Sequence, residues 1–174
     1  VGITGSSGKT STKEILRQFL QHFYRVHASP LSFNNDLGTS LTVLDLDPAH
    51  EVYIQELGAS EKNSIRRLAE LILPEVGVIT GIGIAHLKGF GSVEGIYEAK
   101  LELAEVVSGQ GGAMIYDGDN KKLCEKMAAY PATKISFGED RSSFLRFSKV
   151  KHTTEGYNFT VDGKGEFFIP THAA

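Results

Sequence analysis

Hydrophobic runs of strand length alternate with helical patterns of apolar residues along about the first 140 positions of the chain. This alternation is typical of βαβ units, which build a mainly parallel sheet with helices on its faces. We expect strands at residues 1–4, 51–57, 76–80, 113–116 and 134–137, and helices at residues 9–23, 62–73, 93–107 and 120–130. At 174 residues the chain suits a single α/β domain with one core.

Two details of the pattern refine this picture. In the helix expected at 9–23, the spacing of Ile15, Phe19, Leu20 and Phe23 places them on one apolar face. After Gly138 the pattern changes to short alternating stretches at 144–150, 157–161 and 166–169, with Asp162-Gly163 as a hairpin turn. The end of the chain therefore predicts a small antiparallel appendage.

Composition narrows the classes of partner. No apolar stretch approaches the roughly 20 residues of a membrane helix, so we expect no membrane partner. The net charge is −3 and no long basic run occurs, which disfavours nucleic acid. The single cysteine, Cys124, cannot form an internal disulfide and fits a reducing compartment, so we expect a cytoplasmic protein.

A glycine-rich turn, GSSGKTS, lies between the first strand and the first helix. Backbone N–H groups in such a turn and the helix N-terminus together favour a bound anion. We predict nucleotide contacts from Gly5, Ser6, Ser7, Gly8, Lys9, Thr10 and Ser11. By analogy with phosphate loops, Lys9 would reach the phosphates and the Thr10 hydroxyl would bind Mg²⁺.

The spacing of this loop departs from the usual GxxxxGK[ST], because Ile3 stands where the first glycine is expected. The first glycine is Gly5, which gives the shorter pattern GxxGKT. The alternative is a plain strand-to-helix turn, but the GKT sequence at the start of a helix favours nucleotide binding.

Glu56 follows the hydrophobic run of residues 52–54 and therefore lies at the end of an expected strand. In a parallel sheet the carboxyl ends of strands share one edge with the phosphate loop, where open α/β sheets keep their sites. Phosphoryl transfer needs Mg²⁺ held by oxygen ligands, so Glu56 is a candidate ligand. The alternative is a solvated carboxylate at a strand end.

His86 lies in GIGIAHLKGFGS, beyond the strand expected at 76–80, and so at the same sheet edge. It is a candidate metal ligand, although a histidine taken alone is more often a hydrogen-bonded loop residue. The other histidines are most simply solvated.

Lys100 shares one helical stripe with Ile96, Leu103 and Val107, so its ammonium group starts from an apolar face. The side chain either extends along its stem to water or keeps a buried amine with a lowered pKa. A neutral amine can act as a nucleophile or be chemically modified.

Four stretches, TGSSGKTSTKE, SFNNDLGTSLTVL, IQELGAS and GIGIAHLKGFGSVEGIYEAKLEL, follow one another in this order. Together they resemble the central ATP-binding domain of the Mur ligases, which implies a P-loop NTPase-like fold. The resemblance implies ATP-dependent amide formation, in which the γ-phosphate activates a carboxylate as an acyl phosphate and an amine displaces phosphate. FNND and HLKGFGS are most similar to Mur ligases that join D-alanyl-D-alanine to UDP-N-acetylmuramoyl-tripeptide, a precursor of the cell wall.

The resemblance also implies roles for the candidate residues. Lys9 would hold the phosphates of ATP, Thr10 and Glu56 would share one Mg²⁺, and His86 would lie near a second Mg²⁺. Lys100 would be carbamylated by CO₂, which turns an awkward buried cation into an anion beside the metal.

Asn34 and Asn35 would lie by the muramoyl-peptide substrate, although without the resemblance they read as a polar loop. Mur ligases have three domains, so residues 1–174 would be a central domain without its N-terminal UDP-binding and C-terminal domains. We expect this chain alone to bind ATP weakly and not to ligate, because closing domains complete such sites.

Three alternatives stay open on the sequence. The first is another Mur-type or folylpolyglutamate-type ligase. The second is a P-loop phosphotransferase or nucleotide switch, which would turn over without an amine. The third is a non-catalytic nucleotide-binding module that regulates a partner.

Overall fold

In the computed structural model, which describes residues 1–83 and 87–170, one sheet has the strand order β2-β3-β1-β4-β5-β6-β7-β8-β9. Neighbouring strands from β2 to β7 run parallel, and β7, β8 and β9 pair antiparallel. The strands are β1 (Gly2–Thr4), β2 (Val26–Ala28), β3 (Val52–Glu56), β4 (Val76–Ile79), β5 (Ala113–Asp117), β6 (Thr133–Gly138), β7 (Leu145–His152), β8 (Gly156–Val161) and β9 (Gly165–Pro170). The expected α/β class with an antiparallel appendage is confirmed.

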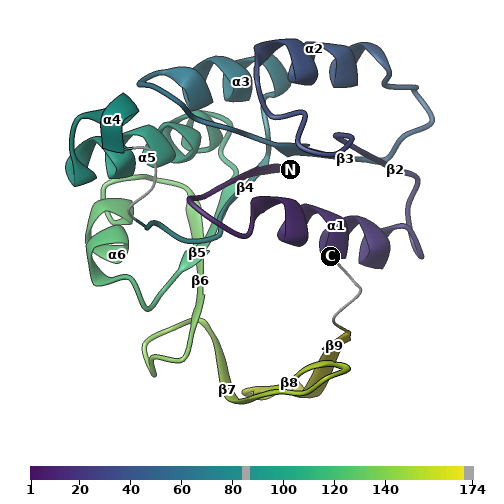
Figure 1. Ribbon diagram of the computed structural model, residues 1–174, viewed down its shortest axis with the longest axis vertical. Coiled ribbons are helices and arrows are strands. Elements are labelled where there is room, and N and C mark those ends of the chain that lie inside the picture. Colours follow the sequence, from purple (N-terminus) through teal and green to yellow (C-terminus); the bar gives the residue numbers. More distant parts are fainter. Residues whose placement is uncertain (84–86, 171–174) are drawn as a thin grey trace.

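Helices connect the parallel strands, as the alternating pattern predicts (Figure 1). They are α1 (Lys9–Leu20), α2 (Asp36–Leu44), α3 (Ser64–Ile72), α4 (Leu87–Phe90), α5 (Val93–Gly109) and α6 (Lys121–Met127). The expected helices and parallel strands are all present, with ends displaced by a few residues. In the described residues, no helix has the length and apolar character needed to cross a bilayer.

The side chains of the sheet divide between two apolar layers because successive residues of a strand face opposite sides. Ile3, Ile54 and Val78 form a cluster with Leu16 and Leu20 of α1. The opposite face carries a larger cluster built on α3, α5 and α6, in which the buried residues include Leu57, Ile65, Ile79, Leu103, Met114 and Met127. The parallel part of the sheet is thus covered on both faces, which is typical of α/β proteins.

Of the apolar face expected on the first helix, Leu20 packs on the sheet but Phe19 and Phe23 do not. Phe19 and Phe23 are 61% and 67% exposed, while Leu16 and Leu20 reach the core. A fully buried Lys13 lies on the packed face. The hydrophobic pattern was misleading here because a lysine side chain is buried against the sheet while two phenylalanine side chains are exposed to solvent.

β2, α2 and α4 were not predicted. β2 has three residues, VHA, all half-buried, which is too short for a recognisable hydrophobic run. α2 buries Gly38, Thr39 and Thr42 while Leu37 and Leu44 are exposed, so its apolar residues do not mark its buried face. The segment between β2 and α2, residues 29–35, is hydrogen-bonded to the end of β3, where the candidate site lies.

Candidate nucleotide site

The loop between β1 and α1 depends on two glycines. Gly8 caps α1 with φ 77°, a left-handed conformation that favours glycine. A Cβ atom on Gly5 would lie 2.0 Å from Oγ1 of Thr80, the residue that follows β4, so only glycine fits at this position. Ile3 is buried within β1, so the position where the usual pattern has its first glycine belongs here to the strand and not to the loop.

The segment after β4 holds the loop in place. The Ser6 amide donates to the carbonyl of Gly81 at 2.9 Å, and the Ser6 hydroxyl donates to the carbonyl of Gly83 at 3.1 Å. The Thr80 hydroxyl donates to the carbonyl of Ser7 at 2.6 Å. These bonds hold the backbone of the loop in place, which is what an anion-binding turn needs.

Glu56 joins the first helix to the segment before α2. Its Oε2 accepts from the Thr10 hydroxyl at 2.7 Å, and its Oε1 accepts from the Asn34 amide nitrogen at 2.7 Å. The side chain is 1% exposed. Alternation along β3 places Glu56 on the same face as Ile54, the face that α1 covers. Two hard oxygen donors, Thr10 and Glu56, therefore meet beside the phosphate loop.

Lys100 approaches the same edge from the opposite face of the sheet. It is 4% exposed, and its Nζ lies 3.5 Å from the hydroxyl of Thr4, the last residue of β1. Burial lowers the pKa of Lys100 to about 8, and the positive charge of Lys9 adds to the decrease, while Glu102 opposes it. Ile96, Leu103 and Val107 of the same stripe are buried, so the predicted apolar setting of this amine is confirmed.

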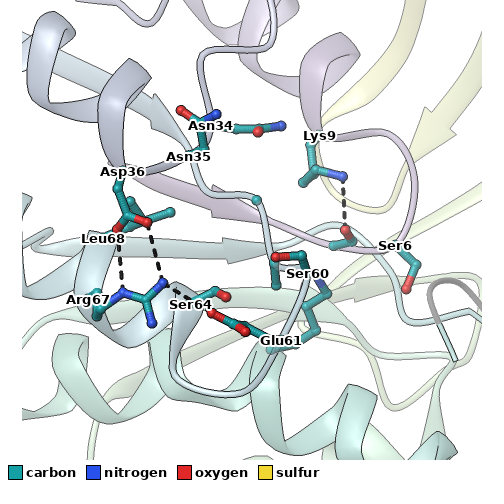
Figure 2. Close-up of a pocket in the computed structure, with 14 residues that line it drawn as sticks. Ser6, Lys9, Asn34, Asn35, Asp36, Ser60, Glu61, Ser64, Arg67 and Leu68 are labelled. Atoms are coloured by element: carbon teal, nitrogen blue, oxygen red, sulfur yellow. Dashed lines mark hydrogen bonds and ion pairs between the residues drawn. The ribbon is translucent and has the colours of Figure 1, made fainter. Parts of the chain in front are cut away.

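One cavity of about 470 Å³ brings several of these groups together. Of the predicted site residues, it is lined by Gly5, Ser6, Lys9, Asn34, Asn35 and Lys100. Figure 2 shows Ser6 and Lys9 on one side of it, with Lys9 bonded to the carbonyl of Gly5 at 3.1 Å. The other predicted site residues that the structure describes do not line the cavity; they are Ser7, Gly8, Thr10, Ser11 and Glu56.

The other side of the cavity carries charged groups that the sequence did not single out. Arg67 of α3 pairs with Asp36 at 3.3 Å and with Glu61 at 3.6 Å, as Figure 2 shows. The Asn35 side chain accepts from the Gly38 amide at 2.8 Å and so caps α2. Asn35 thus has a structural partner as well as a place beside the cavity.

Glu102 was also missed, although it lies two residues beyond Lys100. Its carboxylate, 5% exposed, accepts from the backbone amides of Asn63 and Arg66 at 2.7 and 2.9 Å. It therefore caps the start of α3 from a neighbouring helix, since the N-cap residue Asn63 makes no side-chain cap of its own. A polar residue beside an apolar stripe was its one signal in the sequence.

His86, predicted as a metal ligand, lies outside the described residues. Within residues 1–83 and 87–170, no three side chains of the His, Cys, Asp and Glu types gather as a metal cluster. Thr10 and Glu56 still fit Mg²⁺, which binds through one or two protein oxygens together with substrate phosphates and water.

The model of the Mur ligase middle domain family matches residues 3–173. The chain belongs to this family. As a Mur ligase middle domain it is 39% identical, over 98% of its length, to the UDP-N-acetylmuramoyl-tripeptide--D-alanyl-D-alanine ligase of Bacillus subtilis. It spans 36% of the length of that relative.

Solved structures agree with this assignment of the Mur ligase middle domain. A crystal structure of MurF from Acinetobacter baumannii superposes with a TM-score of 0.84 and 31% identity, over 97% of this chain and 37% of that one. MurF from Thermotoga maritima in complex with ADP gives a TM-score of 0.86 and 27% identity, over 97% and 39%.

Proposed function

We propose that this chain is the ATP-binding part of an ATP-dependent amide ligase that adds D-alanyl-D-alanine to UDP-N-acetylmuramoyl-tripeptide in peptidoglycan synthesis. The observation that carries the proposal is one cavity that joins a phosphate loop, Lys9 and the buried amine of Lys100, with the Thr10–Glu56 pair beside it. The names of the relatives in Bacillus subtilis and Acinetobacter baumannii support this substrate pair.

In this proposal the loop binds ATP through its backbone amides and Lys9. Thr10 and Glu56 would hold Mg²⁺, which would neutralise negative charge at the phosphates. The carboxylate of the tripeptide attacks the γ-phosphorus and ADP leaves. The amine of D-alanyl-D-alanine then attacks the acyl carbon, loses a proton, and phosphate leaves. Asn34 and Asn35 would contact the muramoyl peptide, and His86 would be a ligand of a second Mg²⁺.

Lys100 is proposed to carry a carbamate. With a pKa of about 8, roughly a tenth of the amine is neutral at pH 7, and only the neutral amine attacks CO₂. The nitrogen forms a bond to carbon and loses a proton, and the product is an anion. That anion relieves the repulsion between Lys100 and Lys9 that lowers the pKa. An oxygen ligand for Mg²⁺ would then face the phosphate loop.

We further propose that the chain works as the middle part of a longer ligase. This ligase would act in the cytoplasm, where ATP is available. The chain spans little more than a third of the length of the relatives it matches. Domains on either side would bind the UDP moiety and close over ATP.

The experiment that tests the proposal is ATP-dependent phosphate release by the full-length protein. We expect release to require both the muramoyl tripeptide and D-alanyl-D-alanine. Release without any amine would instead indicate a phosphotransferase or nucleotide switch. Release with glutamate and a folate, or with another amino acid, would indicate a different ligase of the superfamily.

The carbamate has its own test. Lys100→Ala should abolish ligation, and short carboxylic acids added to the variant should restore part of it by replacing the missing anion. Full activity of the variant without any addition would exclude the carbamate.

A further inference from the structure

Lys13 is a charged side chain with no exposed surface. It lies on α1, four residues after Lys9, on the face that packs against the sheet. A buried ammonium group is costly unless it is paired and hydrogen-bonded. Lys13 satisfies that requirement with an ion pair to Glu14 at 3.2 Å and with two backbone carbonyls.

Both carbonyls belong to the segment of residues 29–35 that runs from β2 to α2. Lys13 Nζ donates to the carbonyl of Ser29 at 2.6 Å and to the carbonyl of Leu31. The side chain of Leu31 is 78% exposed, so this part of the segment has little apolar packing of its own. Lys13 therefore supplies the interior contact that an apolar side chain would usually make.

The first route from Lys13 to the nucleotide site passes through Ser29. The Ser29 amide donates to the carbonyl of Ile54 at 2.9 Å, and the Ser29 hydroxyl accepts from the amide of Glu56 at 3.2 Å. Ser29 is 1% exposed. The residue that Lys13 contacts is thus bonded directly to the backbone of Glu56.

The second route runs along the segment. The Gln55 side chain, itself fully buried, donates to the carbonyl of Phe33 at 2.7 Å. The carbonyl of Asn34 accepts from the Gly58 amide at 2.8 Å, and the Asn34 side chain donates to Glu56. Interior donors therefore hold the segment at residues 29, 31, 33 and 34, and its end presents an amide to the Glu56 carboxylate.

Leu31 shows what Lys13 has to hold. Its φ is 46°, a left-handed conformation that is unfavourable for a non-glycine residue. Its exposed side chain makes no compensating core contact. The bond from Lys13 to the Leu31 carbonyl stabilises this conformation.

We propose that Lys13 is a positioning residue for the nucleotide site, whose ammonium group fixes residues 29–34 so that Asn34 and Ser29 orient Glu56 toward Thr10. This inference rests on the proposed function for the role of Glu56 toward Mg²⁺. Lys13 does not line the cavity, and its Nζ bonds to the carbonyls of Ser29 and Leu31, so we expect it to act through Glu56.

The test replaces Lys13 by Met in the full-length protein and measures ligation against Mg²⁺ concentration. We expect the half-saturating Mg²⁺ concentration to rise about tenfold, the size seen when partners of metal ligands are removed. Adding Asn34→Ala to Lys13→Met should raise it little further, because both changes release the same carboxylate.

Met127→Ala is the matched control, because it removes a fully buried side chain of α6 and lowers stability without touching residues 29–35. If Lys13→Met and Met127→Ala lower the melting temperature alike and neither changes the Mg²⁺ requirement, the positioning role is wrong. Lys13→Gln, which keeps a donor but loses charge and reach, is the milder variant if Lys13→Met does not fold. It should give an intermediate rise, and an unchanged Mg²⁺ requirement in a folded Lys13→Gln protein would also overturn the proposal.

Amide hydrogen exchange separates this inference from the proposed function. The Phe33 amide donates to the carbonyl of Pro30 inside the segment, and the Gly58 amide donates to the carbonyl of Asn34 at its end. Lys13→Met should speed exchange at these two amides by about tenfold relative to Met127→Ala. This readout needs no ligation. If the wild-type protein fails to ligate but exchange changes as expected, the ligase assignment fails and the hold of Lys13 on the segment stands. Unchanged exchange in a ligating protein refutes the role of Lys13 alone.

Discussion

The two ends of the sheet are built on different principles. Near the phosphate loop, four polar side chains are buried and each has a polar neighbour; they are Lys13, Gln55, Glu56 and Lys100. In β7, β8 and β9, which lie apart from α2 and α3 in Figure 1, the one buried residue is Gly156. Backbone ladders hold that end together.

This contrast predicts that the two ends differ in their tolerance of substitution. Buried polar groups must be fully bonded or they cost free energy, so they specify one arrangement of the atoms around them. The appendage has exposed apolar side chains at Val150, Tyr157, Phe167 and Phe168 and no such network. We therefore expect similar substitutions to have large effects on function at the loop and small ones in the appendage.

The largest effect should come from Lys9→Ala. If Lys9 contacts the phosphates as we propose, removing this cation should lower kcat of ligation by about 10²–10³-fold, as removal of one preorganised charge stabiliser does elsewhere. The matched control is Lys151→Ala on the exposed strand β7, which should leave kcat unchanged. Comparable losses in the two variants, measured by phosphate release, would contradict the contrast between the two ends.

The second effect is on stability and has the opposite sign. The pKa of Lys100 is lowered from 10.5 to about 8, so the unfolded chain binds this proton more tightly than the folded one. Below pH 8 both states are mostly protonated, and the buried charge costs folding about 3 kcal/mol. In CO₂-free buffer at pH 7, Lys100→Met should therefore be more stable than wild type by up to that amount.

The pH dependence provides the control for this prediction. Between pH 8 and 10.5 the folded lysine is neutral while the unfolded one is still charged, so stability rises with pH in wild type relative to the variant. Denaturant titrations at pH 7 and pH 10 should show the gap closing. A gap that stays constant across this range would mean that the Lys100 amine is not desolvated in the folded protein.

How much of this could be predicted from sequence depends on what each residue signals. β3, β4 and β5 were predictable because their apolar runs are bounded by turns, and Lys9, Thr10, Glu56 and Lys100 because strand ends and a helical stripe locate them. Sequence could not predict the segment of residues 29–35, because its supports are backbone carbonyls bonded to distant side chains. Nor could it predict that Lys13, rather than Phe19, faces the core, since hydrophobicity alone favours the phenylalanine.

The third effect tests the close approach of Gly58 to Asn34. A Cβ atom on Gly58 would lie 2.7 Å from Asn34 Oδ1 and 2.8 Å from the Asn34 carbonyl oxygen, so Gly58→Ala must displace Asn34. We expect a loss of about 1–3 kcal/mol in stability and a raised Mg²⁺ requirement, because Asn34 orients Glu56. Gly109→Ala is the control, since nothing lies within 4 Å of its added methyl group. Equal behaviour of the two variants would show that residues 34 and 58 adjust freely.

The smallest effect is expected at the hairpin of the appendage. Arg146 Nη1 lies 3.0 Å from Asp162 Oδ2, but the two side chains are 33% and 52% exposed, so water screens the pair. Asp162→Asn should therefore cost less than about 1 kcal/mol and leave nucleotide binding unchanged. Gly163→Ala, in the same turn, should cost more, because Gly163 has φ 69°. Urea titrations of both variants with and without Mg²⁺ and ADP would measure this. A change in ligand stabilisation on Asp162→Asn would show that the appendage is coupled to the phosphate loop, because a screened surface pair has no direct means of altering a site it does not contact.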